Sequence, residues 1–124
     1  MNNDIDKIRR FLVLNPKYNM EAYIFVLDSL RILIKEMDAQ RHVSGVELLD
    51  SVKKLGDEKF GFLAPLVFES WGITETIDFG HIVFSLVEMG VLRKTNKDSL
   101  EDFRNVFQLD QVFQQSFQRS LEQF

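Results

Sequence analysis

The chain has two histidines, His42 and His81, and their side chains are its foremost candidates for metal binding or acid–base chemistry. Imidazole is a common metal ligand and a common acid–base group. His81 has a carboxylate one helical turn away, Asp78, but two ligands on one helix do not complete a metal site. His42 stands in "RHVSG", between Arg41 and Ser44. Arg41, His42 and Ser44 could form a pocket or a loop tied down by its own hydrogen bonds, and we favour the tied loop.

Other catalytic arrangements find little support in the sequence. The chain has no cysteine, which excludes a thiolate nucleophile and Cys-based zinc or iron–sulfur sites. No Ser–His–Asp context and no phosphate-binding glycine loop can be recognised. Carboxylate pairs such as Asp57–Glu58 and Glu101–Asp102 are typical of surface charge. We therefore expect no enzyme, no metal and no cofactor.

The triplet Asp78-Phe79-Gly80 matches the magnesium-binding triplet of protein kinases. The other kinase motifs, a glycine-rich loop and a catalytic loop, are missing, and the chain is far too short. We interpret the triplet as a coincidence, and Gly80 as a position where a neighbouring element packs closely against a helix.

The segment from Trp71 to Phe107 has the layout of a helix-turn-helix followed by a wing. Helices are expected at 45–56, 60–71 and 76–89, then the β-prone "VLRKT", the turn "NKDS" and the segment "EDFRNVF", which fits a returning strand or a helical turn. Residues 41–107 are thus predicted to form a winged-helix-like core with a small β-hairpin.

The chemistry of this segment argues against DNA. The outward face of the helix at 76–89 would carry Asp78, His81, Ser85 and Glu88, whereas base contacts are made mainly by Arg, Lys, Asn and Gln. The formal net charge is −4 and the pI is near 5.1, without the basic surplus of a nucleic-acid binder. A DNA-binding regulator is kept as the alternative, with His81 and Ser85 near bases and Arg93, Lys94 and Lys97 on phosphates.

Helices are expected to flank this core on both sides. Residues 1–40 read as a helical pair, 5–14 and 20–37, with Asn19 as the N-cap of the second helix, whose thin polar stripe predicts a central position. Ser44 and Glu47 form a capping box for the helix that follows, which we expect to end at Gly56. Residues 108–124 read as a tail helix rich in Phe and Gln.

The tail helix carries the best interaction feature of the sequence. Phe113, Phe117, Leu121 and Phe124 lie on one stripe at helical spacing, in a chain with twelve Phe residues. The stripe either docks on the protein's own core, which we favour, or is offered to a second copy or another partner.

Length and hydropathy predict one domain of 124 residues, mainly α-helical. The N-terminus does not resemble a signal peptide, and the most apolar run is interrupted by Asp28 and Arg31, so no membrane span is expected. We expect a cytoplasmic, acidic, non-enzymatic module that acts through protein–protein contacts, with a homodimer as one form and nucleic acid as the less favoured partner.

Several blocks of the chain resemble a small bacterial family of uncharacterised proteins. These blocks are "NPKYNMEAYIFVLDSL", "RHVSGVELL", "FGFLAPLVFESWGITETIDFGHIVFSLVEMGVL" and "DSLEDF". They follow one another in the same order and cover nearly the whole chain apart from the Gln-rich tail. The resemblance implies a free-standing bacterial domain of unknown function, and it implies no activity and no site residues.

Overall fold

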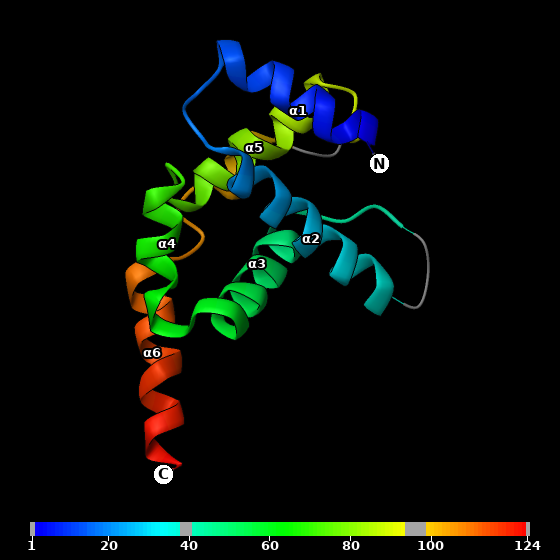
Figure 1. Ribbon diagram of the computed structural model, residues 1–124. Helices are drawn as coiled ribbons and strands as arrows, with labels where there is room; N and C mark the ends of the chain where they lie inside the picture. Colours follow the sequence, from blue (N-terminus) through cyan, green and yellow to red (C-terminus); the bar gives the residue numbers. More distant parts are fainter. Residues whose placement is uncertain (1, 38–40, 94–98, 124) are drawn as a thin grey trace.

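The computed structural model describes residues 2–37, 41–93 and 99–123, which are built of helices and connecting loops (Figure 1). The elements are α1 (Asn2–Leu14), α2 (Met20–Glu36), α3 (Gly45–Phe60), the 3-10 helix η1 (Gly61–Leu63), α4 (Ala64–Ser70), α5 (Thr76–Glu88), the 3-10 helix η2 (Leu100–Phe103) and α6 (Leu109–Glu122). None of the described residues is in a strand. The predicted winged-helix core with a β-hairpin is therefore wrong, while the mainly helical character is confirmed.

The segment expected as the returning strand begins with the short helix η2. Its start is capped by two hydrogen bonds, in which Ser99 N donates to Asp102 Oδ2 (3.0 Å) and Glu101 N donates to Ser99 Oγ (3.3 Å). Its end is held by Thr76, whose hydroxyl donates to the carbonyl of Phe103 (2.6 Å) and accepts from the N–H of Val106 (3.1 Å). These polar groups are satisfied without a partner strand, so the backbone has no need of a ladder.

The central helix is α3 rather than α2, contrary to the expectation from the polar stripe of α2. It packs against α2, α4, α5, α6, η1 and η2. Gly56 does not end it but lies buried in its last third, where an added Cβ would come within 3.0 Å of Phe68 and 3.1 Å of Phe113. A glycine here lets two aromatic rings approach the helix backbone.

The core is a single cluster of buried side chains to which all six α-helices contribute. Phe68 of α4 lies at its centre, fully buried, with its ring centroid 5.3–5.8 Å from those of Phe25, Trp71, Phe79 and Phe113. All four pairs are edge-to-face or tilted, which suits the quadrupoles of aromatic rings. The high Phe content of the sequence thus serves mainly to fill this core.

Several predicted helix ends are confirmed. The Asn19 side chain accepts a hydrogen bond from Ala22 N and caps α2. Gly72 and Gly90 follow α4 and α5 with φ of 94° and 81°, the left-handed conformation expected of a glycine that ends a helix.

No helix in the described ranges is both long enough and apolar enough to span a membrane.

Candidate functional sites

The face of α5 that was expected to meet DNA is only partly covered: Asp78 is buried, His81 and Ser85 are half-buried, and Glu88 is exposed. Asp78 is almost fully buried, and its Oδ1 accepts a 2.5 Å hydrogen bond from the hydroxyl of Tyr18. Ser85 forms a hydrogen bond with Tyr23 of α2, which is also buried. The prediction that Asp78 faces outward was wrong. Its partner, Tyr18, lies sixty residues earlier in the chain, and local periodicity does not reveal such a contact.

Asp78 organises the start of α5. Its Oδ2 accepts hydrogen bonds from the backbone N–H groups of Thr74 (2.9 Å) and Glu75 (3.0 Å). Burial would raise the pKa of Asp78, but the hydrogen bonds from Tyr18 and these two N–H groups outweigh it and lower the pKa. Burial and the same hydrogen bond raise the pKa of Tyr18 far above its usual range. Asp78 is thus a structural carboxylate.

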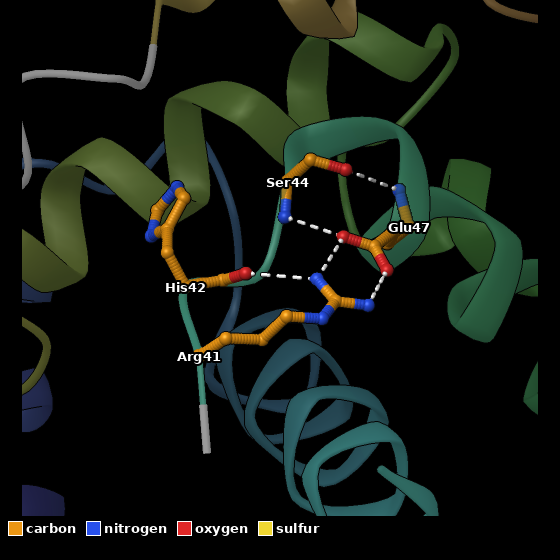
Figure 2. A network of polar contacts seen from close by, with 4 residues as sticks. All are labelled: Arg41, His42, Ser44 and Glu47. Carbon is orange, nitrogen blue, oxygen red and sulfur yellow. Dashed lines mark hydrogen bonds and ion pairs between the residues drawn. The ribbon is translucent and has the colours of Figure 1, made fainter. Parts of the chain in front are cut away.

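The connector 41–44 joins α2 to α3 and is fixed by a polar network (Figure 2). Ser44 and Glu47 form the predicted capping box, with Ser44 N donating to Glu47 Oε1 and Glu47 N donating to Ser44 Oγ, each over 3.1 Å. Arg41 binds both carboxylate oxygens of Glu47, at 2.9 and 2.6 Å, and donates to the carbonyl of His42 (3.0 Å). These bonds tie Arg41 and Ser44 to Glu47.

The charges in this network stabilise one another. The Arg41 guanidinium, followed by the Ser44 backbone N–H, lowers the pKa of Glu47 to about 2. The same carboxylate raises the pKa of Arg41. Both side chains are substantially exposed, so solvent and salt screen the pair. The pairing keeps Glu47 ionised well below neutral pH.

A cavity of about 370 Å³ opens beside this connector. Its walls are mostly aliphatic and come from α2, α3, α5 and η2, while Arg41, His42, Ser44 and Arg93 lie at its polar side. Figure 2 shows the His42 ring pointing away from the Arg41–Glu47 pair, toward the yellow-green ribbon of α5. The three residues singled out as pocket or tied loop therefore line a cavity and belong to a tied loop.

Of the three basic residues predicted on the wing, only Arg93 lies in the part of the chain that the structure describes. Arg93 is exposed and lies at the mouth of the 370 Å³ cavity. Lys94 and Lys97 lie outside the described residues.

The apolar stripe of the tail helix is buried at Phe113 and exposed one turn later, from Phe117 onward. Phe113 is fully buried and packs on Phe68 in the core, which is docking in cis. Phe117 and Leu121 are 39% and 57% exposed. Phe124 lies outside the described residues. Beyond Phe113 no described residue of α6 is buried, and the red end of α6 extends past the other helices in Figure 1.

Exposed apolar residues of an earlier segment meet this part of α6. Phe62 and Leu66 are 52% and 64% exposed, and the Phe62 ring lies 4.5 Å from that of Phe117, centroid to centroid. Phe62, Leu66, Phe117 and Leu121 line one open groove of about 490 Å³. We call these four residues the α4–α6 surface.

Sequence reasoning missed the contribution of Phe62 and Leu66 to this surface. A signal was present, since residues 60–71 are apolar nearly throughout, more than one buried face of a short helix requires. The spacing of four residues places Phe62 and Leu66 on a common side, but periodicity does not reveal which side is buried.

No protein-family model, no curated protein sequence and no solved structure matches the chain.

Proposed function

We propose that the protein is a cytoplasmic, non-enzymatic module that acts through protein–protein contacts, and that its α4–α6 surface pairs two copies of the chain. The observation that carries this proposal is the exposed apolar groove in which Phe62 and Leu66 meet Phe117 and Leu121. The largest apolar patch of a small protein, typically a few hundred Å², is often functional.

The size of the surface fits a small interface. At about 200 Å² for a large apolar side chain, the exposed fractions of its four residues correspond to roughly 400 Å². A standard interface buries about 800 Å² on each partner, and weak ones bury less. With a polar rim added, the α4–α6 surface would form the core of a small, concentration-dependent dimer.

The chemistry around the groove favours a second copy over a charged partner. Its polar side chains are two neutral amides, Gln114 and Gln118, and one carboxylate, Asp110. Amides both donate and accept, so they can pair with themselves across a two-fold axis. A partner recognised by charge would leave most of this groove unmatched.

An antiparallel pairing of two α6 helices also avoids repulsion between the acidic groups. Asp110 and Leu121 mark opposite ends of the groove along α6. With the axis near Phe117, the two Asp110 carboxylates would lie about 20 Å apart at 1.5 Å per residue. That exceeds the Debye length of about 8 Å at physiological salt.

The test is the molar mass in solution as a function of concentration. Sedimentation velocity from micromolar to millimolar protein should show a monomer–dimer equilibrium. Leu121→Glu and Leu66→Glu should each weaken it at least about tenfold, because each places a carboxylate in an apolar interface. Leu14→Glu, at the end of α1 and 85% exposed, is the matched control and should leave it unchanged.

Point variants are preferable to deletion of residues 108–124, because Phe113 belongs to the core. Far-UV circular dichroism and thermal unfolding should be alike in the three variants. A strict monomer at millimolar concentration, or equal effects of Leu14→Glu and Leu121→Glu, would contradict the proposal.

A further inference from the structure

We infer that the cavity beside the connector 41–44 binds a small amphipathic carboxylate, with its aliphatic tail inside and its anionic head at Arg93. This site is separate from the α4–α6 surface, so neither proposal depends on the other. The inference rests on the shape of the cavity, on its apolar walls and on the sign of the charges at its mouth.

The interior of the cavity is chemically uniform. Six of its wall residues are large and apolar and come from four different elements: Leu30, Ile34, Leu48, Val83, Val87 and Phe103. At about 370 Å³ the cavity falls within the range of small-molecule pockets. Such walls offer no hydrogen-bond partner, so they favour an aliphatic tail over a polar metabolite.

The charges at the cavity are opposite in sign to the protein as a whole. The chain has a net charge of −4, yet the ionisable groups that line the cavity are Arg41, His42 and Arg93, with no carboxylate among the described lining residues. The charge of Arg41 is matched by Glu47. Within the described part of the chain no ion pair engages Arg93, which leaves it available to an anion.

A second cavity of the same molecule is lined by charges of the opposite sign. It measures about 430 Å³ and is lined by three carboxylates, Glu69, Glu75 and Asp110. An anionic ligand is repelled there and attracted at Arg93, so the protein itself provides an internal comparison.

The connector contributes a rigid wall. Arg41 and Ser44 are held by Glu47 through the hydrogen bonds drawn in Figure 2, so the backbone on either side of His42 is fixed before any ligand arrives. A preformed wall lowers the ordering cost of binding.

The experiment titrates the full chain, labelled with ¹⁵N, with decanoate below micelle-forming concentrations, and follows backbone amide shifts. Decanol, with the same tail and no charge, and acetate, with the charge and no tail, are the ligand controls. Saturable shifts should appear at residues 42–48, 83–87 and 92–93 and not around Glu75 and Asp110. Decanoate should bind at least about tenfold more tightly than either control.

Two variants and a matched control separate the head from the tail. Arg93→Gln should weaken decanoate about tenfold, and more at low salt than at high salt, while leaving decanol unchanged. Val87→Phe should fill the cavity and weaken both ligands. Arg10→Gln, an exposed arginine on α1, should change neither.

Three results would overturn the inference. One is the absence of saturable shifts in the wild-type protein. Another is equal affinity for decanoate and decanol. The third is an Arg93→Gln variant that binds decanoate as tightly as Arg10→Gln does.

Discussion

Replacement of Gly80 by alanine tests how tightly η2 is packed on α5. An added methyl group would lie 2.7 Å from Cγ, 2.8 Å from Cδ2 and 2.9 Å from Cβ of Phe103. Rotation of the Phe103 side chain moves its ring but not its Cβ, so the clash can be relieved only if the backbone of η2 moves. The prediction that Gly80 permits close packing by a neighbouring element is confirmed by this contact.

The expected cost of Gly80→Ala follows from three contributions. Overpacking costs about 1–3 kcal/mol. The higher helix propensity of alanine returns up to about 1 kcal/mol. Movement of η2 weakens the hydrogen bond from the Thr76 hydroxyl to the Phe103 carbonyl, which is worth about 1 kcal/mol. We expect the free energy of unfolding to fall by about 1–3 kcal/mol.

Urea unfolding followed by far-UV circular dichroism measures this loss. The midpoint should fall while the slope m stays the same. Gly56→Ala is the comparison, because its methyl group would meet only the ring edges of Phe68 and Phe113, at 3.0–3.2 Å. Those ring edges can shift by a few tenths of an ångström, so the change in stability should be smaller than for Gly80→Ala.

A double-mutant cycle isolates the clash itself. Phe103→Ala removes the ring, at a cost of about 3–5 kcal/mol, and leaves the methyl group at position 80 with far less to displace. The loss in the double variant should be smaller than the sum of the two single losses by at least about 1 kcal/mol. A Gly80→Ala protein as stable as wild type, or additive losses, would refute the packing argument.

Two further predictions concern ionisable groups. The pKa of Glu47 is about 2 in the folded protein, so the stability it contributes is present above about pH 4.5 and is lost as the pH falls toward 2. Glu47→Gln should flatten the urea midpoint over this range, and NMR titration of a carboxyl with an ordinary pKa would contradict the bidentate pairing with Arg41. The pKa of Asp78 is lowered, so its ionised form stabilises the fold above its unfolded pKa and that contribution disappears as the pH falls through the folded value. Tyr18→Phe should raise the pKa of Asp78 and cost about 1.5–3 kcal/mol at neutral pH; an unchanged Asp78 titration would show that the 2.5 Å hydrogen bond does not form in solution.

Helix ends were predictable because their signals are local. The cap by Asn19, the capping box of Ser44 and Glu47, and the left-handed glycines 72 and 90 each depend on residues within a few positions of the helix end. The error at η2 was also local in origin. The pattern Ser99-x-x-Asp102 is a capping signal for a helical turn, and it favours the helical turn over the returning strand.

Long-range partners explain the remaining errors. A helical wheel places Asp78 on a polar face of α5, but nothing near it in sequence reveals that Tyr18 will cover that face. The wheel also cannot show that the body of the protein ends between Phe113 and Phe117, which divides one stripe into a buried and an exposed part. Periodicity identifies a face, and only tertiary packing decides what lies against it.

The two interpretations of the connector 41–44 turn out to be compatible. Arg41 and Ser44 form their hydrogen bonds mainly with Glu47. Side chains engaged in this way contribute little direct affinity for a ligand. A binding site nevertheless needs walls that hold their shape, and the supporting bonds of such walls are commonly made within the protein. Arg93, which lies on a different segment, is then the charged group through which this cavity would discriminate between ligands. On this argument the hydrogen bonds that tie the loop are a condition for recognition at the cavity rather than an alternative to it.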